Sequence, residues 1–341
     1  MKSMKPARII ISRTDNIGDV VLCLPVAGVL KQHFPDCKIF FLGNSYTKAI
    51  IESCEFVDEF IDGKLIIQAE ENSAVNVLKN LRADVIIHVF PNKKLTILAK
   101  KAKIPIRIGT TNRTYHWGKC NRLTRLSRKA SPYHEAQLNL KLLVPLGVKE
   151  LVSLEEIPAY FGLSKIKPLR DDLKNLLQPD KFNLILHPKS KGSAREWGLD
   201  HFAELIDLLP ADKFRIFISG TKEEGIAMKD FIGQHPSVID ITGKCSLPEF
   251  VSFIAHADGM IAASTGPLHI AAAMNKIALG IYAPMRPIFP TRWAPLGKNA
   301  GYIVLDKKCN DCKKCKECEC IRSIQSIEVI EKLLQMISLK K

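Results

Sequence analysis

The sequence lacks any long hydrophobic run. Its longest uninterrupted apolar stretch, residues 20–30, has only 11 residues, whereas a membrane-spanning helix needs about 20. A secretory signal is missing too, because Arg13 and Asp15 interrupt the short apolar stretch near the N-terminus. We therefore expect a cytoplasmic protein without a membrane span.

Acidic residues are absent from one long segment. Between Val85 and His134 there are 12 Lys or Arg and no Asp or Glu, and the whole chain carries a net charge of +15. A solvated basic face is the ordinary interpretation. A block of one sign also indicates partners that carry phosphate, namely nucleic acid, phosphorylated molecules or an anionic lipid surface.

Solenoid repeats and low-complexity tracts are also absent. The 341 residues, 46% hydrophobic and 25% charged, are typical of about two globular domains. Short apolar runs alternate with helix-period segments, which predicts βαβ units, parallel sheets and the α/β fold class. The predicted strands are 8–12, 38–42, 85–89, 105–108, 183–187, 214–219, 260–263 and 277–282.

Between residues 151 and 180 the periodicity weakens and Lys, Pro and Asp accumulate. We place the interdomain linker there, with an N-terminal Rossmann-like domain at 1–165 and a C-terminal one at 180–322. Open α/β domains bind ligands at the carboxyl ends of their strands, so a cleft between the two domains is the predicted ligand site.

Three polar loops lie at predicted strand-to-helix junctions. In the first, Arg13-Thr-Asp-Asn-Ile-Gly-Asp19, Gly18 allows a tight turn and Asp19 begins the following helix. Asp19 could act as a general base at the sheet edge. The ordinary alternative is that Asp19 only caps the helix.

The second loop runs from His187 to Trp197 and combines small residues with Lys189, Lys191 and Arg195. Cations and close backbone approach suit a phosphate, although the spacing is not that of a P-loop. The third loop begins at Ser264, where Thr265 and Gly266 precede a helix that would point its N-terminus at an anion. His269 could contact the same anion or be a packed helix residue.

Taken together, the three motifs resemble glycosyltransferase family 9, the heptosyltransferases. The resemblance rests on R-T-D-N-I-G-D-V-V-L-C-L-P, H-P-x-S-x(4)-R-E-W and S-T-G-P-L-H-I-A-A-A, and on H-E-x-x-x-N-L-x-L-L-x-x-L-G from His134 to Gly147. It covers nearly the whole chain.

The resemblance implies a GT-B fold of two Rossmann-like domains that face each other across a cleft, with a C-terminal helix (323–341) packed back on the first. It implies an inverting transfer of heptose from ADP-L-glycero-D-manno-heptose to the lipopolysaccharide inner core, without an essential metal or other cofactor. The partners would be this donor and an anionic glycolipid at the cytoplasmic face of the inner membrane, met by a monomer in peripheral association with that membrane.

By position, Asp19 matches the family's general base, and Arg195 matches a cation, usually Lys, that neutralises the leaving diphosphate. The resemblance thus predicts three groups of residues, of which the catalytic pair Asp19 and Arg195 is the first. The donor and phosphate group is Gly18, Lys189, Ser190, Glu223, Ser264, Thr265, Gly266, Pro267 and His269. The acceptor group is Arg13, Lys93, Arg113 and Arg122.

The chain also departs from the family. Ser264 stands where heptosyltransferases often have Asp, and Lys222 takes the place nearest to an expected nucleotide-binding Glu. These departures bear on the donor sugar more than on the fold. A family 9 enzyme that uses another nucleotide sugar for a surface glycan is therefore an alternative.

Five of the ten cysteines crowd into one segment as Cys309-x2-Cys312-x2-Cys315-x2-Cys318-x-Cys320. Four thiolates suit zinc or an iron–sulfur cluster, but this spacing is too tight for an ordinary two-knuckle zinc site. Cys309, Cys312, Cys315 and Cys318 are candidate ligands of a structural metal, and a reduced or partly bridged surface loop is the alternative.

A more distant alternative is a basic nucleic-acid-binding protein with a zinc-bound cysteine loop. Tyr115, Trp117 and Tyr133 lie among the basic residues, as a stacking surface requires. No known nucleic-acid-binding motif is present, however, and this function leaves the three anion loops unused. We therefore expect no nucleic-acid partner.

Overall fold

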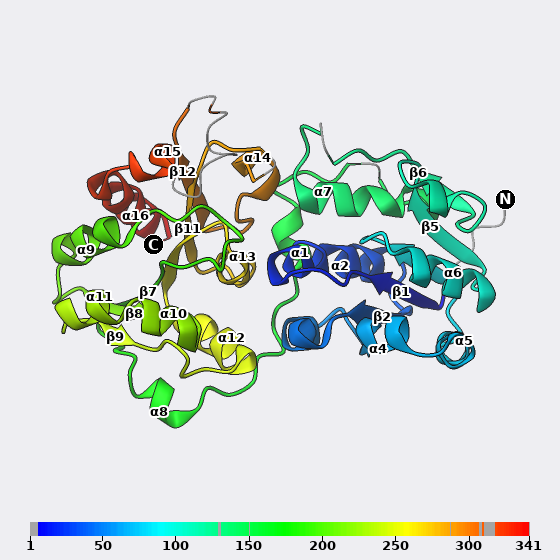
Figure 1. Ribbon diagram of the computed structural model, residues 1–341, viewed down its shortest axis with the longest axis horizontal. Coiled ribbons are helices and arrows are strands. Elements are labelled where there is room, and N and C mark those ends of the chain that lie inside the picture. Colours follow the sequence, from blue (N-terminus) through cyan, green and yellow to red (C-terminus); the bar gives the residue numbers. More distant parts are fainter. Residues whose placement is uncertain are drawn as a thin grey trace. The chain divides into compact units, whose positions relative to one another are not determined.

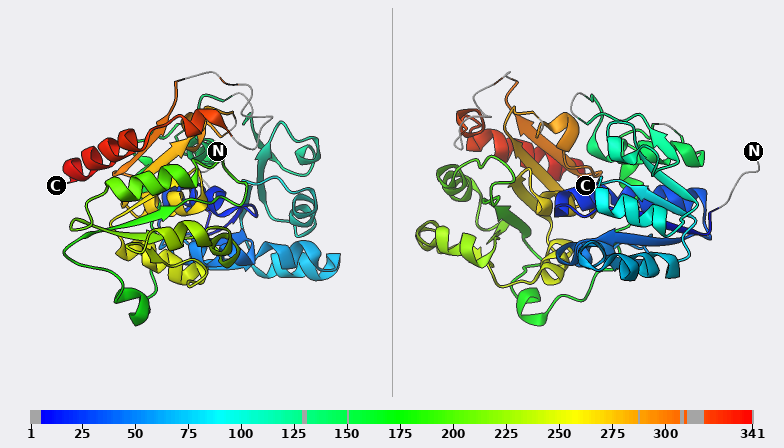
Figure 2. Two further views of the ribbon diagram at one scale, coloured as in Figure 1. Left: turned by 60° about the vertical axis from the view of Figure 1, so that its left-hand side comes forward. Right: turned by 45° about the vertical axis from the view of Figure 1, so that its right-hand side comes forward.

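Each half of the chain forms a parallel six-stranded sheet with helices on both faces (Figures 1 and 2). The computed structural model describes residues 6–128, 131–149, 151–286, 288–306, 309 and 318–340. The chain divides into two units, Met1–Lys165 and Ile166–Lys341. The predicted α/β class with two Rossmann-like sheets is confirmed.

In the first unit the strand order is β3-β2-β1-β4-β5-β6. The strands are β1 (Arg8–Ser12), β2 (Lys38–Gly43), β3 (Glu59–Asp62), β4 (Val85–His88), β5 (Ile106–Thr110) and β6 (Arg122–Thr124). The helices are α1 (Ile17–Val21), α2 (Leu24–His33), η1 (Ser45–Thr47), α3 (Lys48–Glu52), α4 (Gly63–Gln68), α5 (Glu71–Asn80), α6 (Lys93–Lys101), η2 (Thr114–His116), α7 (Glu135–Leu140), η3 (Lys141–Leu146) and η4 (Ile157–Tyr160).

The second unit repeats this topology with the order β12-β11-β10-β7-β8-β9. Its strands are β7 (Phe182–His187), β8 (Phe214–Ile218), β9 (Ile239–Asp240), β10 (Gly259–Ala263), β11 (Ile277–Tyr282) and β12 (Ala300–Val304). Its helices are α8 (Asp171–Lys174), α9 (Leu199–Leu208), α10 (Lys222–Ala227), α11 (Lys229–Gln234), α12 (Leu247–His256), α13 (Gly266–Ala273), α14 (Pro290–Trp293), α15 (Glu319–Arg322) and α16 (Ser326–Lys340).

The central strands are apolar along their length because helices cover both faces of each sheet. Ile9, Ile10 and Ile11 of β1 are fully buried. Ile10 packs with side chains of α5 and α6 on one face, while α2 and α7 contact each other within the same unit. The continuous apolar run of β1 therefore predicted its central position correctly.

The C-terminal helix α16 packs on the second unit. Its buried residues Val329 and Leu333 belong to the same core as Trp197 and Phe202, and the helix contacts α9 and β11. Trp197 Nε1 donates to the carbonyl of Ile324 just before the helix. These contacts lie within the second unit, and the packing of residues 323–341 on the first domain stays a prediction.

The strand order places the polar loops at a defined point of each sheet. In both units the order reverses beside the first strand, between β1 and β4 and between β7 and β10. Ligands of open α/β sheets bind at this point, outside the carboxyl ends of the strands. The loops after β1, β7 and β10 are the three that the sequence singled out.

A buried polar cluster lies at the carboxyl ends of β1 and β4. Ser12 pairs in register with His88, and neither Ser12 Oγ nor either ring nitrogen of His88 has a hydrogen-bond partner in the described chain. The ring of His116 lies 5.8 Å from that of His88 between centroids. Burial, with the neighbouring charges of His116 and Arg107, lowers the pKa of His88 to about 3.

His88 makes the first unit sensitive to acid. Its pKa is lower in the folded chain than in the unfolded chain, so the unfolded chain binds protons first and stability falls as the pH drops below about 6.5. We expect the free energy of unfolding to be about 2 kcal/mol lower at pH 5 than at pH 7 from this residue alone. Urea unfolding at both pH values should show most of this difference vanish in His88→Leu. An unchanged difference in that variant would contradict the assignment.

Candidate active site

Arg13 forms the centre of a buried charge network directly after β1. Its side chain is 3% exposed and donates two hydrogen bonds to the Asp15 carboxylate, at 2.8 and 2.9 Å. It also donates to Glu135 at 3.1 Å and Asn139 at 2.9 Å, both on α7, and forms an ion pair with Asp19. Every group that surrounds this guanidinium is an oxygen acceptor.

A second cation closes the network. Arg128 donates to Glu135 at 2.9 Å, to Asn139 at 3.0 Å and to the carbonyl of Val89, after β4, at 3.3 Å. Glu135 is fully buried and accepts from both arginines. It starts α7, whose capping box is formed by His134 and Gln137. The cap therefore fixes where the Glu135 carboxylate lies.

Asp19 and Asp15 are the two partly exposed carboxylates of this network, and the Asp15 side chain is 15% exposed. Asp19 is the more exposed of the two. Its side chain is 19% exposed and lies on α1, whose N-cap is Asn16, so the alternative that Asp19 serves as the N-cap is wrong. Burial raises its pKa to about 6, with Arg13 opposing the rise and Asp15 and Glu135 adding to it. A carboxylate with this pKa is ionised at neutral pH and more basic than an ordinary aspartate.

Of the four predicted acceptor residues, Arg13 pairs with Asp19. Arg13 is buried and its guanidinium is occupied by carboxylates, so it holds Asp19 in place. Its contact with an acceptor stays a prediction. Lys93 begins α6, Arg113 precedes η2 and Arg122 lies on β6, all exposed. In the described chain none of these three forms an ion pair with the Arg13 network.

In the second unit, the loop after β7 is a tight turn built by Ser190. Its hydroxyl donates to the carbonyl of Ala194 at 2.9 Å and accepts from the N–H of Gly192 at 3.2 Å. Lys189 pairs with Glu196 at 2.9 Å, and the same carboxylate accepts from the Ser190 N–H. Ser190 thus shapes the loop that carries the cations.

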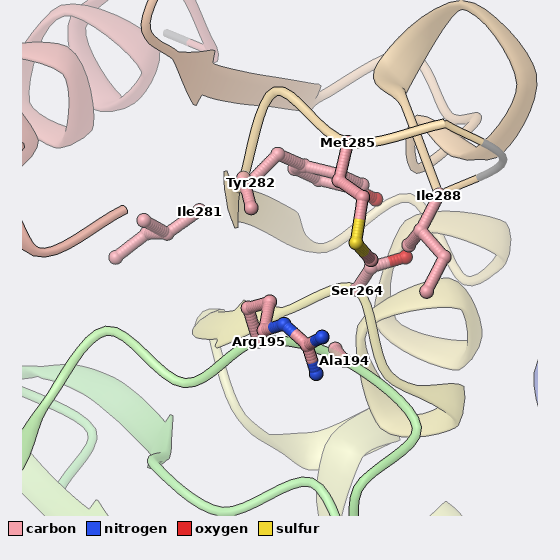
Figure 3. A pocket seen from close by; sticks show the side chains of 8 residues that line it. Ala194, Arg195, Ser264, Ile281, Tyr282, Met285 and Ile288 are labelled. Carbon is pink, nitrogen blue, oxygen red and sulfur yellow. The ribbon is translucent and has the colours of Figure 1, made fainter. Parts of the chain in front are cut away.

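Arg195, at the end of this loop, lines a small pocket together with Ser264 (Figure 3). The remaining lining is largely apolar. It comes from Ala194 of the same loop and from Ile281, Tyr282, Ala283, Met285 and Ile288, which belong to β11 and the segment that follows it. The pocket therefore joins one guanidinium and the hydroxyl-bearing side chains of Ser264 and Tyr282 to an apolar wall, and the Tyr282 hydroxyl donates to the carbonyl of Trp293.

Thr265 is the N-cap of α13, and Pro267 follows in its first turn. The buried Thr265 Oγ1 has no hydrogen-bond partner in the described chain. His269 is 3% exposed and its N–H donates to the Thr265 carbonyl at 3.4 Å. Together with Gly266, a buried unpaired hydroxyl at a helix N-terminus is suited to an anion.

A wider depression adjoins the loop after β7. It is lined by Lys189, Lys191 and Glu196 of that loop together with Thr221 and residues of α10. Thr221 and Glu224 are occupied by the capping box of α10. Glu223 is exposed and lines the depression. Its own N–H, the Thr221 hydroxyl and the charges of Lys191 and Lys222 lower its pKa. A role of Glu223 in nucleotide binding stays a prediction.

The cysteine segment is only partly described. Cys318 and Cys320 are buried in the core of the second unit, and Cys309 packs against that core. Cys312 and Cys315 lie outside the described residues. Within the described ranges, no three His, Cys, Asp or Glu side chains are grouped as metal ligands.

Sequence reasoning missed the most connected part of the site. Glu135, Asn139 and Arg128 lie more than 110 residues from Arg13, and nothing in the chain shows which cation such residues will pair with. The available signal was the H-E-x-x-x-N spacing, which places Glu135 and Asn139 one helical turn apart.

No helix in the described part of the chain has the length and apolar character of a membrane span.

The fold and the two sets of loops define a two-domain enzyme of the GT-B class. Residues 73–321 match the family model for glycosyltransferase family 9 (heptosyltransferase). The chain belongs to this family and is a glycosyltransferase.

Relatives of similar sequence are named as glycosyltransferases, and a solved structure has the same fold. A predicted glycosyltransferase of Haemophilus influenzae is 30% identical over 85% of this chain and 86% of its own. Lipopolysaccharide heptosyltransferase 3 of Escherichia coli is 26% identical over 83% and 84%. The solved structure of Escherichia coli ADP-heptose lipopolysaccharide heptosyltransferase II superposes with a TM-score of 0.76 at 19% identity, over 98% of this chain and 99% of the other.

The buried network predicts a large effect of one isosteric change. Glu135→Gln removes a carboxylate that two arginines share, so the free energy of unfolding should fall by about 3 kcal/mol. The matched control is Glu52→Gln, which breaks an exposed pair with Lys48 at 3.6 Å and should cost less than about 0.5 kcal/mol. Urea unfolding of both variants measures this. Equal costs would contradict a structural role for Glu135.

Proposed function

We propose that this glycosyltransferase moves heptose from ADP-L-glycero-D-manno-heptose to an inner-core acceptor of lipopolysaccharide, with inversion at the anomeric carbon. The observation that carries the proposal is the partly exposed Asp19 carboxylate, held by a buried arginine at the switch point of the first sheet. Family membership and relatives named as lipopolysaccharide heptosyltransferases support heptose as the sugar.

In this mechanism Asp19 takes the proton from the acceptor hydroxyl. The oxygen attacks the anomeric carbon as the bond from that carbon to the diphosphate breaks, and ADP leaves with the electron pair. One carboxylate base suffices for a single inverting displacement.

The second unit provides for the leaving group. Arg195 and the α13 N-terminus at Thr265 and Gly266 place a cation and N–H groups where negative charge grows on the diphosphate. Glu223 is suited to accept from the ribose hydroxyls of the nucleotide. Because these groups supply the charge stabilisation, we propose that no metal ion is required.

The acceptor is a lipid-linked glycan, so the enzyme works at the cytoplasmic face of the inner membrane. Support comes from the basic segment between Val85 and His134, which lies in the same unit as Asp19. An anionic membrane attracts such a segment.

The pocket beside Arg195 favours one second candidate, a family 9 transferase with another donor sugar. The polar groups there are Ser264 and Tyr282, whose hydroxyl already donates to the Trp293 carbonyl, and Ile281, Met285 and Ile288 form an apolar wall. Such a wall is suited to a sugar with fewer hydroxyl groups at that end, because each buried hydroxyl needs a partner.

Asp19→Asn should lower kcat by about 100-fold or more, because general-base catalysis contributes that much. In the unchanged enzyme, kcat/KM should be constant above pH 6 and fall about tenfold per pH unit below it, since the base must be ionised and burial raises its pKa to about 6. The exposed Asp36→Asn is the control. Full activity of Asp19→Asn would refute the general-base role.

Calorimetric titration with ADP, UDP and GDP in the presence of a chelator tests the donor. We expect selective binding of ADP, and a loss of about 10- to 100-fold in affinity in Arg195→Ala because a charge-assisted hydrogen bond is removed. The exposed Lys229→Ala on α11 is the control. A preference for UDP or GDP would exclude the ADP-heptose donor and favour the second candidate.

A further inference from the structure

Trp117 is an exposed tryptophan in the first unit. Its side chain is 58% exposed, whereas Trp197 in the second unit is 1% exposed. The indole N–H donates to the carbonyl of Thr111 at 3.0 Å, so the polar edge of the ring is satisfied by the protein and the apolar body faces solvent. Large apolar side chains in such positions mark interaction surfaces when they are not isolated.

Trp117 is not isolated, because hydrogen bonds bring three segments together around it. Lys100, near the end of α6, donates to the carbonyl of Gly118 at 2.8 Å. The N–H of Thr111 donates to the carbonyl of Thr124 at 3.1 Å, at the end of β6. The segment that carries Trp117 is therefore tied to the end of α6 and to the end of the edge strand β6, two elements that Figure 1 labels. Leu123, next to Thr124 on β6, is 39% exposed.

The charges near this ring are all of one sign. Lys100, Arg113, Arg122 and Arg125 are exposed, and within the described ranges none of the four forms an ion pair with a carboxylate. The neighbouring Lys101, by contrast, pairs with Glu71 of α5. We call Trp117, Leu123 and these four cations the edge patch.

Protection of an exposed strand edge explains only part of the edge patch. Cations on an edge strand discourage pairing with another chain, which accounts for Arg122 and Arg125. It does not account for Trp117, because an exposed apolar ring raises the tendency to associate.

The residue types of the edge patch discriminate between two anionic partners. Single-stranded nucleic acid is held by several aromatic rings that stack on successive bases. Here one ring is strongly exposed and its apolar neighbour is the aliphatic Leu123. Tryptophan at the headgroup level, an aliphatic side chain below it and cations near the lipid phosphates are the usual elements of an interfacial membrane site.

We propose that the edge patch is the surface by which this protein docks on an anionic bilayer, with Trp117 as its interfacial anchor. The proposal rests on the proposed function only for the reason to dock, which is that the acceptor is lipid-linked. It assigns the contact to the end of α6, the η2 turn and β6, and not to the second unit.

Co-sedimentation of the full chain with vesicles tests this. Phosphatidylcholine vesicles should bind little of the protein, and vesicles that also contain phosphatidylglycerol should bind it with a blue shift of the tryptophan emission. Trp117→Ala should abolish the shift and weaken binding. Arg122→Ser and Arg125→Ser should each weaken it about fivefold, as about 1 kcal/mol per cation near the surface implies. Leu65→Ala, at a side chain 66% exposed on α4 of the same unit, and Lys79→Ser, an exposed cation on α5, are the controls and should bind normally.

Nucleotide affinity separates this proposal from the proposed function. ADP binding should be unchanged in Trp117→Ala, and activity should fall with a vesicle-bound acceptor but not with a de-acylated, water-soluble one. Loss of ADP selectivity together with intact vesicle binding would refute the donor assignment and leave the edge patch. Equal binding to both vesicle types, unaltered binding in Trp117→Ala, or a preference for a short RNA over the anionic vesicles would overturn the edge-patch proposal.

Discussion

The burial of the Arg13 guanidinium is the constraint on which the first unit depends. A charge removed from water must be matched by acceptors at hydrogen-bond distance, or its desolvation outweighs what it contributes. One of the matching carboxylates, Asp15, comes from the following loop and a second, Asp19, from α1, but the third, Glu135, comes from α7. Closing the network therefore requires α7 to dock against the end of β1. The Arg13 charge therefore connects the loop that follows β1 with a helix that begins 122 residues later.

The two units share one sheet topology but carry different charged groups at the same point of the sheet. In each, the strand order reverses beside the first strand, so loops from non-adjacent parts of the chain meet at the carboxyl ends of neighbouring strands. The first unit fills this point with a buried arginine and carboxylates, and the second with Arg195 and the start of α13. In the proposed mechanism the first set of groups provides the proton acceptor and the second the anion site.

Buried strands could be predicted from the sequence, whereas edge strands could not. Strands β1 and β11 have the bounds that their apolar runs predict. Strands β6 and β12 were missed, because β6 has only three residues and β12 begins with Ala and Gly, which are poor strand formers. The apolar stretch of residues 20–30 is divided between α1 and α2, since Pro25 starts a new first turn.

The same limit explains what could be predicted of the site. Asp19 and the α13 start stand in local motifs, and each motif contains its own structural cause, a turn or a helix N-terminus. Arg13 was assigned to acceptor binding, because its motif does not show that Glu135 and Asn139 will enclose it. Long-range pairing of buried charges depends on tertiary packing, for which no residue pattern near Arg13 is a signal.

Asp19 owes its basicity to a balance between terms of opposite sign. Burial raises its pKa, Arg13 opposes the rise, and Asp15 and Glu135 support it. Without the cation, burial among two other carboxylates would leave Asp19 protonated and unable to accept a proton at neutral pH. Without burial, it would be ionised but too weak a base to share the proton of a hydroxyl group. A pKa of about 6 lies between these limits, so the structure that closes the first unit also sets the basicity of Asp19.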